Sequence, residues 1–239
     1  MAANSSHIMK AARAQEHLDT LRSELKTYYD TQPCVFQEKE DVAANVYRIR
    51  IRISDPPDRL SLIAGDVFGC LRASLDHLVW SLCTLNTASY AGHTQFPIME
   101  QNKPVSFKGQ IKGIPAAAEA IIESLQPYHG RDRAAVEASP RWRLNKLCNI
   151  DKHRRIPIHG SYAEFKLPAS IPQSLITFEP DGTMSFPLGM KSQVVLHPSP
   201  LFAVTFGDSH EGIECDLPGI ETIYNFVTSD VLPKFAGFL

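Results

Sequence analysis

Two long segments with a helical repeat of apolar residues limit what this chain can fold into. Between residues 8 and 29, and again between about residues 59 and 85, apolar side chains recur every three or four positions. This spacing predicts two long amphipathic helices. In the second segment, His77 and Trp80 belong to an additional stripe, so we expect this helix to be contacted on two sides.

An alternating segment separates the two predicted helices. Residues 46–53 read Val-Tyr-Arg-Ile-Arg-Ile-Arg-Ile, which places the arginines on one side of a strand and the isoleucines on the other. We predict a half-buried strand with a basic outer face, paired with a strand near residues 34–38. Such a face is either exposed to solvent without a binding role or forms an electrostatic binding surface for a polyanion.

Downstream, the apolar spacing changes repeatedly between helical and strand-like. Helices are expected at 115–125, 140–155 and 219–239, with Ser139 as the N-cap of the middle one and Pro233 interrupting the last. Residues 87–112 show no regular period. Between residues 157 and 206 the period is two, which predicts short strands at 161–166, 174–178, 184–187, 193–196 and 201–206.

The sequence therefore predicts an α+β fold, a helical bundle of four to five helices with a small antiparallel β-sheet. We expect residues 1–8 to form a flexible tail and residues 9–239 to form a single domain. Its helical part covers about 9–155 and 217–239, and its β-rich part about 157–206. A chain of 239 residues can bury a stable core without disulfides, and its five widely spaced cysteines predict no disulfide framework.

Charge, hydropathy and sequence motifs limit the binding partners, the location and the cofactors that we expect for the protein. The formal net charge of −2 gives no overall attraction to nucleic acid or to anionic membranes, so such binding requires local patches. No segment resembles a secretion signal or a membrane span, and we expect a cytoplasmic protein without membrane association. No dinucleotide-binding or P-loop motif is present, and no cofactor is expected.

The first cluster of candidate functional residues is Arg72-Ala-Ser-Leu-Asp76-His77, on the second long helix. Arg72 and Asp76 are four positions apart and share a face, so they can form an ion pair. In one interpretation this pair lies at the helix surface and His77 is hydrogen-bonded between helices. In the other, Arg72 holds a phosphate in a cleft while His77 transfers a proton there, as its ordinary pKa permits.

The second cluster lies near the end of the helix expected at 140–155. Six basic residues and one acidic residue fall between positions 141 and 155, and cations are favoured at a helix C-terminus. Asn149 and Asp151 are poor helix formers, which favours a role in a hydrogen-bond network. Asn149 and His153 share a helix face. We expect the two clusters to be halves of one site, completed when helices or subunits come together.

The sequence patterns for a hydrolase or for a metal site are weaker than those of the two charged clusters. Gly207-Asp208-Ser209 is similar to the nucleophile segment of one esterase family, but no Asp-x-x-His follows it. A hydrolase of small esters or lactones is therefore a minor alternative. A metal site built from His77 and His153 with a neighbouring aspartate has no supporting local spacing, and no metal is expected.

The spacing Arg72-x4-His77 resembles the R-x(4–6)-H motif of the HEPN superfamily. A wider set of motifs resembles a broad set of bacterial proteins of unassigned function: Gly65-Asp66-x5-Arg72-x3-Asp76-His77-Leu78-x-Trp80, Phe96-Pro97-Ile98, Gln126-Pro127-Tyr128 and Asn149-x-Asp151-Lys152-His153-Arg154. Two features depart from the HEPN nucleases: the motif arginine is followed by Ala73, where they often have a polar residue, and the β-rich segment lies outside a minimal HEPN bundle.

The HEPN resemblance implies a homodimer that binds RNA and cleaves it without a metal. It implies that His77 is the acid–base group and that Arg72 binds phosphate. The candidate catalytic residues are accordingly His77, Arg72 and His153. The candidate substrate-binding residues surround them on both clusters: Asp76, Asn149, Asp151, Lys152 and Arg154. The alternative is a non-catalytic module in which the two clusters lock helices together or bind an anionic ligand or a partner.

Overall fold

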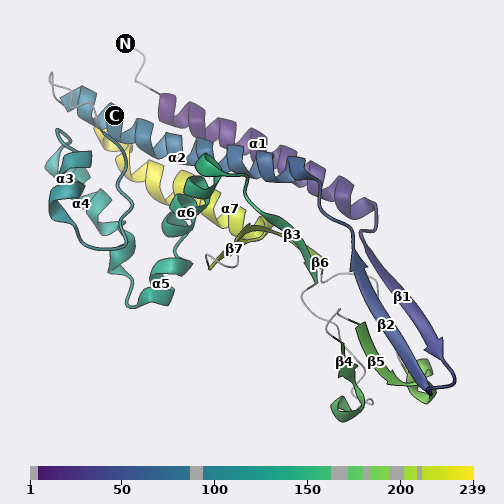
Figure 1. Ribbon diagram of the computed structural model, residues 1–239. Helices are drawn as coiled ribbons and strands as arrows, with labels where there is room; N and C mark the ends of the chain where they lie inside the picture. The colour runs from purple at the N-terminus through teal and green to yellow at the C-terminus, as the bar shows by residue number, and fades with distance from the viewer. Residues whose placement is uncertain (1–4, 87–93, 163–171, 180–182, 194–201, 209–211) are drawn as a thin grey trace. The chain divides into compact units, whose positions relative to one another are not determined.

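The computed structural model describes residues 5–86, 94–162, 172–179, 183–193, 202–208 and 212–239 (Figure 1). The chain is divided into two compact units. The helical unit comprises Met1–Ser23, Asp58–Pro157 and Phe206–Leu239, and the β unit comprises Glu24–Pro57 and Ile158–Thr205. The α+β class predicted from the sequence is confirmed.

Both long helices are present. Helix α1 spans Ser6–Asp30 and helix α2 spans Asp58–Asn86. Their apolar stripes are buried, since residues such as Leu18 and Leu75 have no exposed surface. The additional stripe of α2 is covered only in part, because His77 is half-buried and Trp80 is 39% exposed. Helix α1 begins at Ser6, within the segment expected to be a tail.

Five shorter helices complete the α-helices of the described chain: α3 (Pro104–Gln110), α4 (Ala116–Ser124), α5 (Arg133–Ala138), α6 (Pro140–His153) and α7 (Leu217–Asn225). The predictions of α4 and α6 are confirmed, and the Ser139 side chain caps α6 by accepting from the Trp142 amide. Helices α3 and α5 were not predicted, because each buries a single side chain, Phe107 or Val136, and therefore has no apolar stripe. The described residues thus contain seven α-helices instead of four or five.

The end of the chain changes its helical form near Pro233, as the sequence predicted. Helix α7 is followed by a π-helical turn, Phe226–Val231, and a 3-10 helix, Leu232–Phe238. Proline has no amide hydrogen to donate to the preceding turn, which explains why the regular α-helix does not continue through this region. Within the helical unit, Arg22 of α1 donates hydrogen bonds of 2.9 and 2.7 Å to Glu221 of α7.

The β unit is built on an antiparallel sheet in the order β1-β2-β5-β4. Its strands are β1 (Cys34–Asp41), β2 (Val46–Ile53), β5 (Thr183–Pro187) and β4 (Thr177–Phe178). The predicted β1–β2 hairpin is confirmed. Asn45 adopts a φ of 54° in its turn, a left-handed conformation that asparagine tolerates well. The core of the sheet is a cluster of four buried side chains, Tyr47, Ile49, Met184 and Phe186.

The remaining strand predictions have mixed outcomes. Strand β3 (Ile158–Tyr162) begins three residues before the predicted 161–166, and β6 (Phe202–Asp208) matches 201–206. A 3-10 turn, Gln173–Leu175, occupies the first part of the strand predicted at 174–178. The described part of 193–196 ends a 3-10 segment, Leu188–Gln193, and the rest lies outside the described residues.

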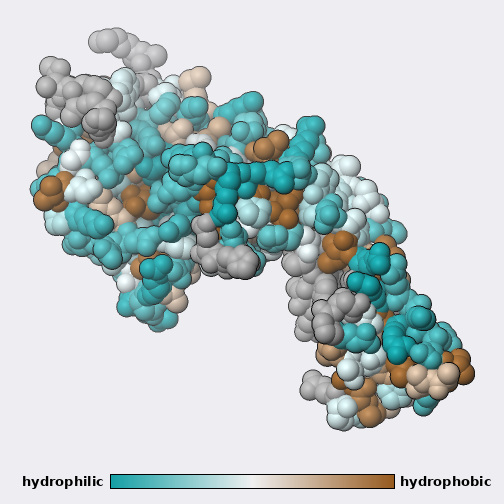
Figure 2. All heavy atoms as spheres, viewed as in Figure 1, coloured by the Kyte–Doolittle hydropathy of each residue, from teal (hydrophilic) through white to brown (hydrophobic). Residues whose placement is uncertain are grey.

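Strand β7 (Ile213–Cys215) was not predicted, because it is only three residues long. It pairs with the end of β6 in the helical unit, where Gly207 has a φ of +134°. A Cβ at Gly207 would lie 2.2 Å from the Ile213 carbonyl oxygen, so only glycine fits there. Hydrophilic residues cover most of the visible surface of the helical unit, with scattered hydrophobic residues (Figure 2). None of the described helices has the length and apolar character needed to cross a membrane.

Candidate functional site

Arg72 and Asp76 together hold the backbone of Phe96. Arg72 Nη2 donates to the Phe96 carbonyl at 2.7 Å, and the Phe96 amide donates to Asp76 Oδ1 at 2.9 Å. The predicted ion pair between Arg72 and Asp76 is present at 3.1 Å. It is not a surface pair, because Arg72 is only 8% exposed. Arg72 therefore acts first as a buried anchor for a segment 24 residues further along the chain.

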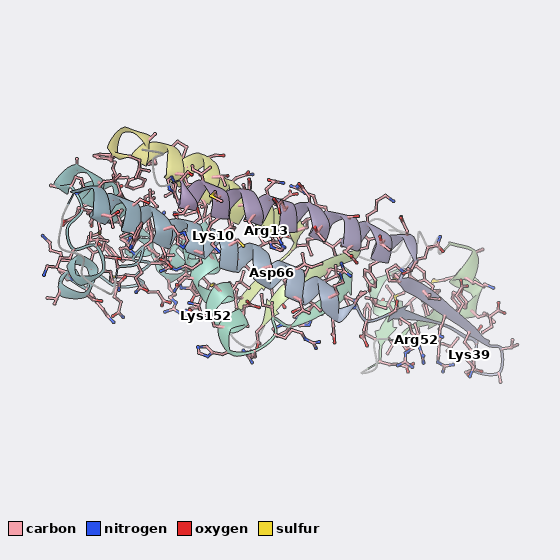
Figure 3. The ribbon with its side chains drawn as sticks, turned by 90° about the horizontal axis from the view of Figure 1, so that it is seen from above. Lys10, Arg13, Lys39, Arg52, Asp66 and Lys152 are labelled. Atoms are coloured by element: carbon pink, nitrogen blue, oxygen red, sulfur yellow. The ribbon has the colours of Figure 1, made fainter. Side chains whose placement is uncertain are left out.

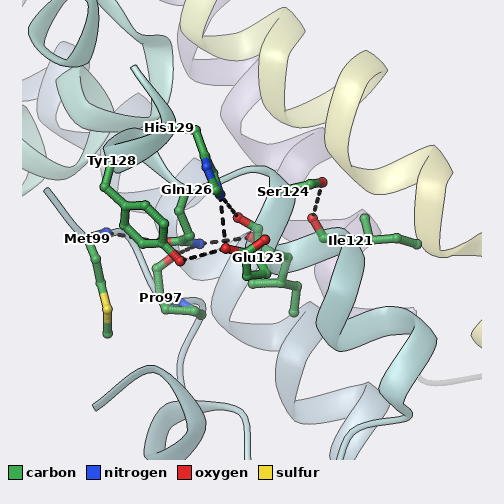
Figure 4. A network of polar contacts seen from close by, with 9 residues as sticks. Pro97, Met99, Ile121, Glu123, Ser124, Gln126, Tyr128 and His129 are labelled. Atoms are coloured by element: carbon green, nitrogen blue, oxygen red, sulfur yellow. Dashed lines mark hydrogen bonds and ion pairs between the residues drawn. The ribbon is translucent and has the colours of Figure 1, made fainter. Parts of the chain in front are cut away.

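Gln126 anchors the same segment from the other side. Its Nε2 donates to the Pro97 and Ile122 carbonyls at 2.9 and 3.0 Å, and its Oε1 accepts from the Met99 amide at 3.1 Å (Figure 4). Gln126 has no exposed surface, so these bonds satisfy an amide that would otherwise be costly to bury. Three of the motifs that carry the sequence resemblance thus form one structural network, around the backbone of residues 96–99.

A pocket of about 350 Å³ lies beside this network. It is lined by Ser6, Asp76, His77, Trp80 and Thr94. His77 Nδ1 and Thr94 Oγ1 are both covered by protein, and neither has a hydrogen-bond partner among the residues that the structure describes. Uncompensated burial of such polar atoms costs about 1–3 kcal/mol each. Two of the residues that line the pocket, His77 and Thr94, thus carry an unsatisfied buried polar atom in its wall, and Asp76 adds a carboxylate to the same lining.

The electrostatics of Asp76 connect this pocket to helix α6. Burial raises the pKa of Asp76, while the Arg72 guanidinium, the Phe96 amide and the Lys152 ammonium act in the opposite direction. Lys152 and Arg72 also lower the pKa of the Cys148 thiol, which burial raises. Asp76 of the first predicted cluster therefore lies within electrostatic range of Lys152 from the second.

Helices α2 and α6 contact each other closely at Gly65. A Cβ at this glycine would lie 2.2 Å from Asp151 Oδ1, so the carboxylate occupies the space that a larger residue would need. Burial raises the pKa of Asp151, and the nearby Asp66 carboxylate raises it further. Asp66 of α2 and Lys152 of α6 are labelled in Figure 3. The aspartate predicted to belong to a hydrogen-bond network thus packs against a helix backbone.

The other residues of the second cluster point to solvent. Asn149 and His153 share a helix face, as predicted, but both are exposed. Arg154 Nη2 pairs with Asp208 Oδ2 at 2.9 Å, and Arg155 pairs with Asp58. Asn149, His153 and Arg154 are not among the residues that line the His77 pocket.

Sequence reasoning missed two residues of the pocket. Thr94 lies in a segment without periodicity, and Ser6 lies in the expected tail, so no local signal marked either of them. Across the described ranges, no three histidine, cysteine, aspartate or glutamate side chains gather in a way that could hold a metal ion. Ser209, which the esterase-like segment singled out, lies outside the described residues.

Comparisons of the chain with family models, with curated proteins and with solved structures find no match.

Proposed function

We propose that this protein is a HEPN-like RNA-binding protein with a metal-independent ribonuclease site at the His77 pocket. The observation that carries the proposal is the pocket itself, in which the imidazole of His77 lies beside Asp76 and the unsatisfied Thr94 hydroxyl. A volume of about 350 Å³ suits a small ligand such as one nucleotide. Trp80 adds a partly exposed aromatic surface on which a base can stack.

In the proposed reaction, His77 accepts the proton of a ribose 2′-hydroxyl. The 2′-oxygen attacks the adjacent phosphorus, and the bond from phosphorus to the 5′-oxygen of the next nucleotide breaks. The products are a 2′,3′-cyclic phosphate and a 5′-hydroxyl, whose proton comes from solvent. His77 then releases its proton to solvent, which restores the neutral imidazole.

We propose that Arg72 is a positioning residue in place of the phosphate contact that the resemblance implies. Its Nη2 is engaged by the Phe96 carbonyl and Asp76, and the side chain is buried, so we treat Arg72 as a positioning residue. Lys152 is exposed and acts on Asp76, which makes it the better candidate for attracting a phosphate. We further propose a homodimer, in which a second copy would add basic residues to the His77 pocket.

The direct test is incubation of the purified protein with end-labelled single-stranded RNA in the presence of EDTA. We expect cleavage that leaves 2′,3′-cyclic phosphate ends and that disappears in His77→Ala. The matched control is His153→Ala, because His153 is exposed and does not line the pocket. Absence of both cleavage and salt-sensitive RNA binding by the wild-type protein would refute the proposal. If His153→Ala abolished cleavage while His77→Ala retained it, the assignment to His77 would be refuted.

A second candidate is a non-catalytic module that binds a small anionic ligand in the same pocket. It is favoured by the Arg72–Phe96 anchor, which shows that part of the first cluster holds the fold together. We would measure thermal stabilisation by uridine 3′-monophosphate and by inorganic phosphate. Stabilisation that is lost in Thr94→Val, in a protein that leaves RNA intact, would support this function over the ribonuclease.

A further inference from the structure

Side chains alternate between the two faces of β1 and β2, which places the arginines of β2 together on one face of the sheet in the β unit. Arg48, Arg50 and Arg52 lie on one face of β2, because side chains two positions apart point the same way. The register pairs Lys39 of β1 with Arg48, which places this lysine on the same face. Four cationic side chains therefore gather on one side of two neighbouring strands.

The opposite face carries the core of the unit and the two glutamates of β1. The buried cluster around Tyr47 and Ile49 lies there. Glu38 accepts a hydrogen bond from the Tyr47 hydroxyl, and Glu40 pairs with Lys191. The two glutamates of β1 thus point away from the arginines. Asp41, which the register places opposite Val46, lies on the basic face and pairs with Arg48.

Acidic residues contact the basic face at Arg48. Arg48 is paired with Asp41 at 2.9 Å and lies 3.6 Å from Glu179, so both carboxylates converge on one arginine. Lys39 and Arg52 are exposed on the β1–β2 hairpin (Figure 3). Along β2, successive arginines are about 6.6 Å apart, since a strand rises about 3.3 Å per residue. This repeat is comparable to the distance between neighbouring phosphates of an extended single strand.

We propose that this face binds the phosphate backbone of single-stranded RNA through its two exposed cations, Lys39 and Arg52. The inference rests on the proposed RNA-binding function but uses residues of the β unit alone. Charge complementarity favours a polyanion, and a guanidinium group can donate bidentate hydrogen bonds to the oxygens of a phosphate. Phosphate contacts carry no sequence information, so we expect this binding not to depend on the identity of the bases.

The test compares two double variants of the full chain that remove equal charge. Lys39→Gln/Arg52→Gln changes two exposed residues of the basic face, and Lys103→Gln/Lys234→Gln changes two exposed residues of the helical unit. Binding of a fluorescein-labelled oligouridine is followed by anisotropy as salt is increased. Because each phosphate contact on a single strand contributes about 0.7 to the slope of log K against log salt, the first variant should lower the slope by about 1.4. The control should leave it unchanged.

The possible outcomes separate this inference from the proposed function. An unchanged slope in Lys39→Gln/Arg52→Gln would overturn the inference, whereas His77-dependent cleavage would still support the ribonuclease. An equal loss in the control variant would show an effect of net charge and would overturn the inference too.

A second experiment measures binding of the same variants to vesicles that contain phosphatidylserine. If the basic-face variant loses vesicle binding while RNA binding is unchanged, the surface binds membranes and the inference fails. Unchanged circular dichroism spectra establish that both variants are folded.

Discussion

Gly65→Ala tests whether the close contact between helices α2 and α6 depends on glycine. The added Cβ would lie 2.2 Å from Asp151 Oδ1 and 2.7 Å from its Cγ. Both distances are well below normal contact, so the aspartate must rotate away or the helices must separate. Overpacking of this kind costs about 1–3 kcal/mol. Alanine returns about 1 kcal/mol through its higher helix propensity, which leaves a net loss of about 1 kcal/mol.

Gly69→Ala is the matched control on the same helix. A Cβ at Gly69 would meet nothing within 4 Å, so alanine should stabilise the protein there by up to about 1 kcal/mol. The two variants should therefore differ by about 2 kcal/mol. For a chain of this size, that corresponds to a difference of about 4–8 °C in the melting temperature.

The measurement is thermal unfolding of both variants, followed by circular dichroism. A third variant, Gly65→Ala/Asp151→Ala, removes the colliding carboxylate. It should gain stability relative to Asp151→Ala alone, as Gly69→Ala does relative to the wild type. Equal melting temperatures for Gly65→Ala and Gly69→Ala would refute the reasoning, because the contact would then exert no steric restriction.

Three further predictions concern Arg72, the carboxyl group of Asp151 and the thiol of Cys215. Arg72→Ala should lower the free energy of unfolding in urea by about 3–5 kcal/mol, because it leaves Asp76 and the Phe96 carbonyl without this partner; a loss below 1 kcal/mol would contradict the anchor. The raised pKa of Asp151 means that its contribution to stability is fully present below its ordinary pKa of about 3.9 and is lost as pH rises through the folded-state pKa. Asp151→Asn should therefore be more stable than the wild type at neutral pH but not in acid, and a pH-independent difference in denaturation midpoints would contradict this. Burial raises the pKa of Cys215 to about 12, so mass spectrometry should find a thiol reagent on half-buried Cys34 and Cys70 long before it labels Cys215, and equal rates would argue against such burial.

The candidate site shows how far the sequence could lead. The ion pair between Arg72 and Asp76 was predictable because residues four apart on a helix are neighbours. Its burial was not, because the partner that covers it is the backbone of Phe96. In the same way, Asn149 and His153 share the predicted face, yet that face is turned to solvent by the packing of α6.

Periodicity in the sequence determined the two long helices, the β1–β2 hairpin and the face on which its arginines lie. These features depend on local geometry, since the repeat of a helix or a strand fixes which side chains share a side. Only the tertiary structure decided that Arg72 is an anchor, that Asp151 lies against Gly65 and that Thr94 joins His77 in a pocket. Each of these contacts joins residues far apart in the chain, and no local pattern records which distant surfaces bury one another.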